Sequence, residues 1–247
     1  MRVDWHTRFL QQAVWTQDLR NYLYEQAGLS QAGIVLEVGC GTGVLLAEIT
    51  RRNQIEVVGV DLDLERLGSS AIHAPEAGLV QANGLDLPFK TGSFGTAFCH
   101  FLLLWVANPA QVIQEMRRVV RVGGSVMALA EPDYGGRIDY PDSLSTLGKW
   151  QMQSLTRQGA DPSIGRKLAG LFHQAGLQDV EAGVLGAKWA GTPSKEDLDL
   201  EWAVMQFDLE GMLPHEDIEK MRSQETTLWE RGERVLFVPT FYAWGRV

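Results

Sequence analysis

Cysteines, positive charges and long apolar runs are all scarce in this chain. The two cysteines, Cys40 and Cys99, stand far apart without a CxxC pair, which excludes a disulfide scaffold and a cysteine-based zinc site. No metal site of any kind is predicted. Lys and Arg number 22 against 31 Asp and Glu, so the net charge of -9 disfavours a nucleic-acid partner. With no apolar stretch long enough for a signal peptide or a membrane span, we expect a cytoplasmic protein.

What the chain does contain is enough apolar sequence for one sizeable core. Of its 247 residues, 45% are hydrophobic and 21% are charged, a composition that excludes a disordered or low-complexity protein. Neither an internal repeat nor a linker rich in glycine, serine or proline marks a boundary. The sequence therefore predicts a single α/β domain over residues 1–247.

Short apolar runs alternate with amphipathic stretches between residues 34 and 131. This alternation is typical of a parallel sheet with crossover helices. The clearest helix runs from Pro109 to Arg121, with Asn108 as its N-cap and Gly123-Gly124 at its end. The predicted strands of this region cover residues 34–38, 55–61, 78–82, 96–104 and 125–131.

The flanking segments also show regular periodicity. Residues 7–26 have helical character and are expected to pack over the edge of the sheet. Strands are predicted at 180–189 and 234–247, as an antiparallel hairpin separated by a helical insertion. Further helices are predicted at 165–175, 196–209 and 215–231. Most of the tryptophans in this part should be core, although an aromatic cage for a cationic amine is an alternative: Trp150, Trp189, Trp202, Trp229 and Trp244.

Three glycines stand at alternate positions where the first strand must turn into a helix. The run from Glu37 to Gly43 reads E-V-G-C-G-T-G, and glycine at such a turn allows positive φ and close approach of a ligand to the backbone. A plain strand-to-helix turn is the simpler alternative, whereas a dinucleotide site would show G-x-G-x-x-G. Asp61 ends the next strand, where a carboxylate can accept both hydroxyls of a ribose or cap a helix, as Asp63 also can. Two acids in one crevice repel phosphates and suit a positively charged nucleoside.

In these residues the chain resembles the class I S-adenosylmethionine-dependent methyltransferases. The resemblance spans roughly residues 34–131 and identifies Glu37 to Gly43 with the family's E-x-G-x-G-x-G motif and Asp61 with its ribose-binding acid. Residues 81–89 are similar to G-D-A-x-x-L-P-F, with Asn83 in place of the acid that meets the adenine amino group and Gly84 offering its backbone N–H. Residues 121–124 resemble R-P-G-G, with Val for Pro.

The resemblance implies a fold, a cofactor and a set of contacts. The fold is an α/β, Rossmann-like, seven-stranded and mostly parallel sheet with an antiparallel terminal hairpin. Residues 1–30 would form an N-terminal helical lid, 31–131 the cofactor-binding core, and 132–247 a substrate-side loop, a helical cap and the last two strands. The residues expected to bind S-adenosyl-L-methionine are Glu37, Gly39, Cys40, Gly41, Gly43, Asp61, Leu62, Asn83, Gly84, His100, Arg8 and Trp15.

His100 and Tyr134 are the residues expected at the reacting methyl group. His100 ends the fourth strand and Tyr134 follows the fifth, so both belong to the edge where parallel strands open their carboxyl ends. A neutral imidazole could act as a base, or His100 could be a polar residue satisfied by its neighbours. Residues 131–141 are the expected substrate-contacting loop, with an ordinary turn held by an Arg137–Asp pair as the alternative. In the lid, Arg8 could pair with the methionine carboxylate and Trp15 could cover the site or pack on the core.

These observations predict methyl transfer from S-adenosylmethionine to a small molecule by in-line displacement, with S-adenosylhomocysteine as product. Positioning and exclusion of water can supply much of the catalysis. The acidic composition and the absence of the motifs of base methyltransferases favour the small-molecule and quinone branch. A cofactor-binding but inactive partner and, less in keeping with the G-x-G-x-G spacing, an NAD-dependent oxidoreductase are the alternatives. The acceptor atom and the oligomeric state are left open.

Overall fold

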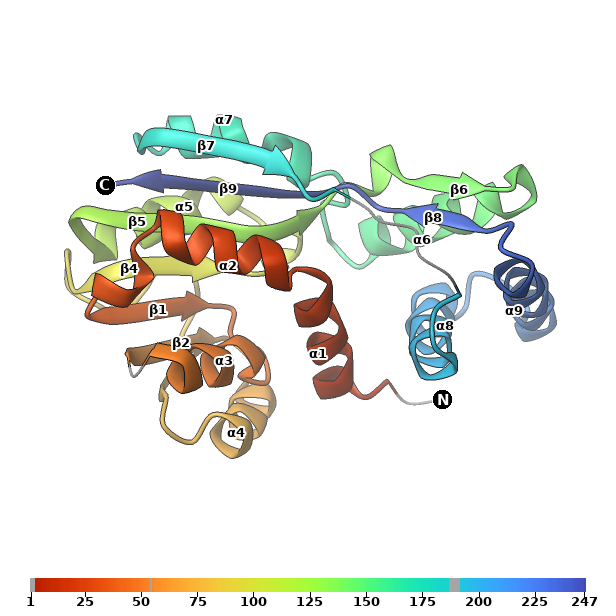
Figure 1. Ribbon diagram of the computed structural model, residues 1–247, viewed down its shortest axis with the longest axis horizontal. Coiled ribbons are helices and arrows are strands. Elements are labelled where there is room, and N and C mark those ends of the chain that lie inside the picture. The colour runs from red at the N-terminus through yellow and green to blue at the C-terminus, as the bar shows by residue number, and fades with distance from the viewer. Residues whose placement is uncertain (1–2, 54, 187–191) are drawn as a thin grey trace.

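A computed structural model, which describes residues 3–53, 55–186 and 192–247, folds around a seven-stranded sheet (Figure 1). The strand order is β3-β2-β1-β4-β5-β9-β7. The first five strands in this order are parallel, and β9 runs antiparallel to both β5 and β7. The predicted fold and its antiparallel hairpin are confirmed, with β9 inserted between β5 and β7. The strands are β1 Ile34–Val38, β2 Glu56–Asp61, β3 Gly78–Gln81, β4 Phe94–Cys99, β5 Val120–Pro132, β7 Gln178–Val184 and β9 Thr240–Arg246.

The central strands are buried on both faces, which is why they read as continuous apolar runs. Successive side chains point to opposite faces, so Leu36 joins one core with Ile113 and Phe172, while Val35 joins the other with Leu46. The first core packs under α5 and α7, and the second under α2, α3 and α4. These helices are α2 Gln17–Gln26, α3 Val44–Asn53, α4 Leu64–His73, α5 Pro109–Val119 and α7 Leu168–Gln174.

Helix α5 begins as predicted and ends differently. The Asn108 side chain accepts a hydrogen bond of 3.1 Å from the backbone N–H of Gln111, with Pro109 in the first turn. The predicted end at Gly123-Gly124 is wrong, because α5 stops at Val119 and β5 starts at Val120. A Cβ on Gly124 would lie 2.4 Å from the Gly95 carbonyl oxygen. The glycine thus allows two strands to approach closely and does not end the helix.

The N-terminal segment forms two helices instead of the single one predicted over residues 7–26. Helix α1 (Trp5–Trp15) starts two residues earlier than expected, since the Asp4 side chain accepts the N–H groups of His6 and Thr7 and caps it. The helix is interrupted at Thr16, and α2 begins at Gln17. Figure 1 shows α1 beyond the carboxyl end of β1 and α2 alongside the sheet.

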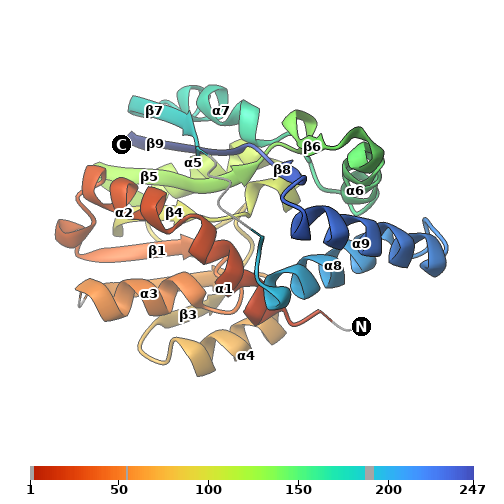
Figure 2. The ribbon, with the colours of Figure 1, turned by 45° about the vertical axis from the view of Figure 1, so that its right-hand side comes forward.

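A second layer stands beside the carboxyl ends of the strands, and we call it the cap (Figures 1 and 2). A two-stranded sheet, β6 and β8, joins it to three helices around a separate apolar cluster that contains Trp202 and Leu144. Helix α6 was not predicted. The elements of the cap are β6 Ile138–Tyr140, α6 Ser145–Arg157, α8 Lys195–Leu209, α9 His215–Glu230 and β8 Val235–Phe237.

Several predicted boundaries in the second half need correction. The strand predicted over 234–247 is two strands in two different sheets, because the chain leaves β8 at Phe237 and enters β9 at Thr240. The predicted loop 131–141 contains the end of β5, the short helix η3 (Tyr134–Gly136) and β6. The helix predicted at 165–175 is η5 (Gly165–Lys167) followed by α7. The end of the strand predicted at 180–189, including Trp189, lies outside the described residues.

The helices are too short or too polar to cross a lipid bilayer. Within the described ranges, no helix combines the length and the apolar character that a membrane span needs.

Candidate active site

The glycine loop between β1 and α3 has the backbone conformation that its sequence predicts. Gly39, Gly41 and Gly43 have φ angles of +76°, +53° and +81°, which L side chains rarely adopt. The backbone N–H groups of Gly39 and Cys40 both donate to the Val60 carbonyl, at 2.7 and 3.0 Å, and so tie the loop to β2. The loop therefore lies at the carboxyl end of the first strand, half-buried at Gly39 and buried from Cys40 to Gly43, and the buried Cys40 thiol serves as packing.

Neighbouring side chains leave no room for a Cβ atom at two of these glycines. A Cβ on Gly39 would lie 2.7 Å from Leu102 Cδ1, and one on Gly41 would lie 2.9 Å from the Phe9 ring. Leu102 follows β4 and Phe9 belongs to α1, so elements from two distant parts of the chain meet over the loop. A side chain at either position would push one of them away.

Asp61 closes the second strand and supports the glycine loop. One carboxylate oxygen accepts the Gly41 N–H at 2.8 Å and the other accepts the Asp63 N–H at 2.9 Å. Asp63, in turn, is the N-cap of α4, because its side chain accepts two backbone N–H groups of that helix. A carboxylate has about four acceptor positions, which leaves Asp61 capacity for two further donors such as ribose hydroxyls.

Glu37 is a buried acid with an unsatisfied oxygen. Its Oε2 has no hydrogen-bond partner among the described residues. Burial and the nearby Asp61 charge raise the pKa of Glu37 well above its usual range, while Arg20 acts in the opposite sense. A buried orphan acceptor beside a backbone cradle fits a ligand that brings a donor or a positive charge.

The residues proposed around an adenine lie at the end of β3 and after β2. The Leu62 side chain is 67% exposed and available to cover a flat ring. The Asn83 side-chain oxygen accepts the Leu85 N–H at 3.0 Å, so it shapes its own turn. A Cβ on Gly84 would stand 3.0 Å from a Val38 methyl, which explains a glycine there.

His100 lies in a hydrogen-bonded chain that sequence reasoning missed. Its Nε2 is 3.0 Å from the Thr16 hydroxyl, and that hydroxyl accepts a bond of 2.5 Å from Arg20 Nη1. Arg20 is 1% exposed and also pairs with Glu48 of α3. Burial and the Arg20 charge lower the pKa of His100 to about 3, so its imidazole is neutral near pH 7. The spacing of Thr16 and Arg20, four residues apart across a helix start, is the one sequence signal that could have indicated this chain.

Glu131 has a structural role that differs from the expected contact with substrate. It is 0% exposed, and its two oxygens accept the backbone N–H groups of Leu102, Leu103 and Leu104. Burial outweighs these three hydrogen bonds and raises the pKa of Glu131 to about 8. The carboxyl group thereby orders the turn that follows His100.

Tyr134 is half-buried at the start of the cap. Burial raises its pKa to about 12, and its charged neighbours include Arg8, Asp208 and Glu201. The loop around it is held by an Arg137–Asp pair, the alternative that the sequence suggested. Arg137 donates twice to Asp139, at 2.7 and 3.0 Å. Thus Tyr134 faces the side of the site where α1 meets the cap, whereas His100 faces Thr16 and Arg20.

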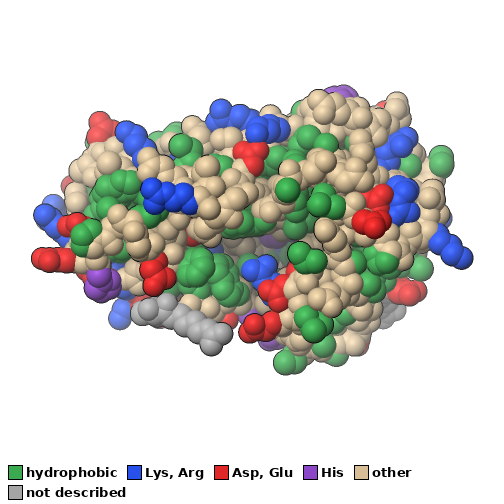
Figure 3. All heavy atoms as spheres, turned by 180° about the vertical axis from the view of Figure 1, so that it is seen from behind, with side chains coloured by type: hydrophobic (Ala, Val, Ile, Leu, Met, Phe, Trp, Pro, Cys, Tyr) green, Lys and Arg blue, Asp and Glu red, His purple; other side chains and the backbone are tan. Residues whose placement is uncertain are grey.

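Arg8 joins α1 to the cap, and Trp15 lies beside the Arg8 guanidinium. The Arg8 guanidinium pairs with Glu201 of α8, donates to Gln11 and lies 4.7 Å from the centre of the Trp15 ring. Trp15 is only half covered, so it is not a core residue. On the face opposite to that in Figure 1, the surface is hollowed between the cap and the sheet, and charged side chains of both signs lie in the hollow (Figure 3).

Comparisons with known proteins agree with this geometry. A sequence profile described as a methyltransferase domain matches residues 36–128. The demethylmenaquinone methyltransferase of Lysinibacillus sphaericus is 31% identical over 185 residues, covering 67% of this chain and 77% of that protein. The chain belongs to the S-adenosylmethionine-dependent methyltransferase family. Neither an inactive binding partner nor an NAD-dependent oxidoreductase is favoured by these matches.

One further relative by sequence and one solved structure are similar to this methyltransferase. The phosphatidylethanolamine N-methyltransferase of Cereibacter sphaeroides is 36% identical over 147 residues, covering 55% of this chain and 71% of that protein. Phosphoethanolamine N-methyltransferase 2 of Haemonchus contortus, solved with phosphomonomethylethanolamine and S-adenosylhomocysteine, shares the fold with a TM-score of 0.61 at 14% identity. The match covers 93% of this chain and 52% of that one.

Helix α1 contacts the glycine loop through His6, which stacks on a second histidine in α4, and this pairing makes the contact sensitive to pH. His6 Nδ1 is 2.8 Å from the Thr42 hydroxyl, and the His6 ring stacks on His73 of α4 with centroids 3.5 Å apart. Burial and His73 lower the pKa of His6, while Asp4 opposes this. A base whose pKa falls on docking binds fewer protons when docked, so its contribution to docking is greatest above about pH 6.5 and is lost as the pH falls from that value through the lowered pKa of His6.

We therefore expect amide hydrogen exchange in α1, corrected for intrinsic rates, to be faster at about pH 5.5 than at about pH 7.5. His6→Gln should remove most of this difference, because glutamine keeps a polar contact with Thr42 but does not titrate. His215→Gln, at the start of α9, changes a histidine away from the lid and should leave the difference intact. An α1 whose exchange shows no such dependence in the unsubstituted protein would contradict the interpretation.

The low pKa of His100 leads to a prediction about turnover. Because its imidazole is already neutral, His100→Asn should leave the shape of the kcat profile unchanged between about pH 5.5 and 8 and should mainly raise KM. Steady-state kinetics with the true acceptor checks this. A fall in kcat of about 10²–10⁴-fold together with loss of an acid limb would instead show that His100 is a general base.

Proposed function

We propose that this methyltransferase transfers a methyl group from S-adenosylmethionine to a small-molecule acceptor by in-line displacement. The observation that carries the proposal is the backbone cradle of positive-φ glycines, with buried Glu37 and Asp61 at the same sheet edge and a cap standing over it. The acceptors named in the relatives' descriptions, a demethylmenaquinone and a phosphatidylethanolamine, support an organic acceptor of modest size.

Residues at different strand ends would bind different parts of the cofactor. We assign the methionine part to the backbone of Gly39, Cys40, Gly41 and Gly43, the ribose to Asp61, and the adenine to Leu62, Asn83 and Gly84. The unsatisfied Glu37 Oε2 provides an acceptor in the same cavity for a positively charged group. When bound, the cofactor supplies an electrophilic methyl on a positively charged sulfur. The lid residues Arg8 and Trp15 would then hold α1 in place against the cap.

The acceptor side is formed by the first residues after β4 and β5 and by the cap. Tyr134, with a pKa raised to about 12, stays protonated and can donate a hydrogen bond that orients an acceptor. His100 is neutral and its Nε2 is engaged with Thr16, so we assign it to lining and orientation. Holding two reactants near attack distance while excluding water can contribute about 7–11 kcal/mol. Residues 1–30, 31–131 and 132–247 would thus act as lid, cofactor core and acceptor side of one catalytic unit.

A transfer assay tests the proposal directly. The full chain would be incubated with methyl-tritiated S-adenosylmethionine and panels of quinols, phenols, amines and phospholipid headgroups, with release of S-adenosylhomocysteine as a second readout. We expect turnover with one chemical class that requires both Asp61 and the glycine loop. Transfer to protein or nucleic acid but to no member of these panels would argue against a small-molecule acceptor, and binding of S-adenosylmethionine without any transfer would argue against turnover.

A further inference from the structure

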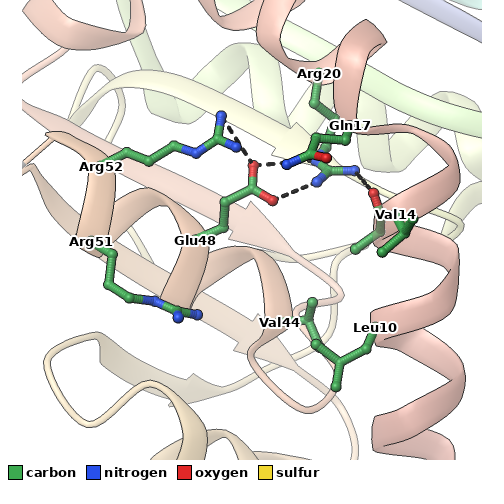
Figure 4. Close-up of a pocket in the computed structure, with 9 residues that line it drawn as sticks. Leu10, Val14, Gln17, Arg20, Val44, Glu48, Arg51 and Arg52 are labelled. Atoms are coloured by element: carbon green, nitrogen blue, oxygen red, sulfur yellow. Dashed lines mark hydrogen bonds and ion pairs between the residues drawn. The ribbon is translucent and has the colours of Figure 1, made fainter.

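A pocket lies between α1, α2 and α3, apart from the residues assigned above to cofactor and acceptor. Its volume is about 320 Å³, within the range of small-molecule sites. Helix α1 contributes Leu10, Ala13 and Val14, and α3 contributes residues at positions 44, 48, 51 and 52, one face of each helix (Figure 4). Neither the family nor the proposed reaction assigns a function to it.

One wall of this pocket is apolar and only partly covered. Val14 is 71% exposed and Leu10 is 44% exposed, although both stand on a helix that packs against α3. Ala13 is buried and Val44 is half-buried beneath them. A ligand with an apolar segment would remove this surface from water. Because Ala13 is buried and Val44 is half-buried, a ligand contacts more of this wall if its apolar segment enters between the helices.

The other wall is positively charged. Arg20, Arg51 and Arg52 line the pocket against a single carboxylate, Glu48. Arg20 takes up the charge of Glu48 through an ion pair, and Arg52 stands 3.9 Å from the same carboxylate (Figure 4). Arg51 donates only to the Ala47 carbonyl of its own helix, at 2.7 Å, and has no ion pair with a described residue. The pocket is therefore a cationic spot on a chain with a net charge of -9.

We propose that this pocket binds an amphipathic anion as a single molecule. Its alkyl segment lies against Leu10, Val14 and Val44, and its carboxylate or phosphate is held by Arg51, while Arg52 adds positive charge from the other side of Glu48 (Figure 4). Guanidinium groups favour such oxyanions through charge-assisted, paired hydrogen bonds. A cationic amphiphile would meet three arginines against one carboxylate, and a small hydrophilic anion would leave the apolar wall exposed.

Binding of dodecanoate to the full chain, measured by calorimetry below its micelle concentration, tests the proposal. We expect saturable binding of one molecule per chain that weakens with added salt. Dodecyl phosphate should bind similarly. Acetate, which has the head without the tail, and dodecyltrimethylammonium, which has the tail with the opposite charge, should bind at least about tenfold more weakly.

Variants locate the binding. Arg51→Gln with Arg52→Gln should weaken dodecanoate binding at least about tenfold, and so should Val14→Asp at the exposed wall. Arg157→Gln with Arg231→Gln makes the same charge change at exposed positions of α6 and after α9, and should leave the affinity unchanged. All of these side chains lie outside the residues assigned to cofactor and acceptor, so methyl transfer reports separately on the proposed function.

Three outcomes would overturn the proposal. The first is the absence of saturable dodecanoate binding. The second is binding that both pocket variants leave intact, which would place the ligand elsewhere, for example at the acceptor side. The third is binding only to vesicles of phosphatidylglycerol, lost in the Arg51 and Arg52 variant, which would make this face a membrane contact and not a pocket for one molecule.

Discussion

Replacing Gly41 with valine is expected to raise the Kd for S-adenosylmethionine at least about a hundredfold, a loss of about 2.7 kcal/mol in binding free energy. Gly41 has φ +53°, where a β-branched residue is strained, and its Cβ would lie 2.9 Å from the Phe9 ring. The new side chain would therefore fill the space over the loop and also displace α1. Calorimetry with S-adenosylmethionine and with S-adenosylhomocysteine would measure the loss.

Gly68→Ala is the matched control for this substitution. Gly68 is in α4, and nothing lies within 4 Å of the position that its Cβ would occupy. Alanine there should leave cofactor affinity unchanged and add up to about 1 kcal/mol of stability through helix propensity. A Gly41→Val protein with native circular dichroism and the affinity of the unsubstituted chain would rule out the glycine loop as the cofactor site.

Asp61→Ala is expected to raise the Kd of the cofactor at least about tenfold, because a charge-assisted hydrogen bond contributes about 1.5–3 kcal/mol. The substitution also leaves the N–H groups of Gly41 and Asp63 without their acceptor. The thermal midpoint should therefore fall together with the affinity. Calorimetry on protein shown to be folded at the assay temperature separates the two effects.

Asp63→Ala distinguishes the ribose role of Asp61 from a purely structural one. It removes the N-cap of α4, which should cost about 0.5–2 kcal/mol of stability. Because Asp63 is not assigned to the cofactor, its loss should leave Kd near the original value. Equal losses of affinity in the two variants would indicate that Asp61 acts through the loop alone.

The parallel part of the sheet and the glycine loop could be predicted because their signals are local. Strands buried on both faces must be apolar along their whole length, and a turn with positive φ calls for glycine. The same locality explains why Asn108 and Pro109 at the start of α5 were identified correctly. A prediction from local pattern failed at Gly123-Gly124, where glycine serves close packing between strands and not a helix end.

The hydrogen-bonded series from Arg20 through Thr16 to His100 could not be predicted, because Thr16 and His100 are 84 residues apart in the sequence. Such a contact arises only when α1 and α2 dock at the end of β4. The same holds for Glu131, whose sequence position suggests a loop but whose carboxyl group is enclosed and bound to three N–H groups. In both cases, burial by distant elements sets the charge state.

The sequence by itself determined the fold class, the positive-φ glycine loop and the acid that ends the second strand, because periodicity and turn chemistry act over a few residues. The tertiary structure alone decided that β9 enters between β5 and β7, that residues 234–247 divide between two sheets, and that Arg8 joins α1 to Glu201 of the cap. These features depend on which surfaces meet across long stretches of chain. The free energy of such contacts comes from burial and charge pairing that no local pattern records.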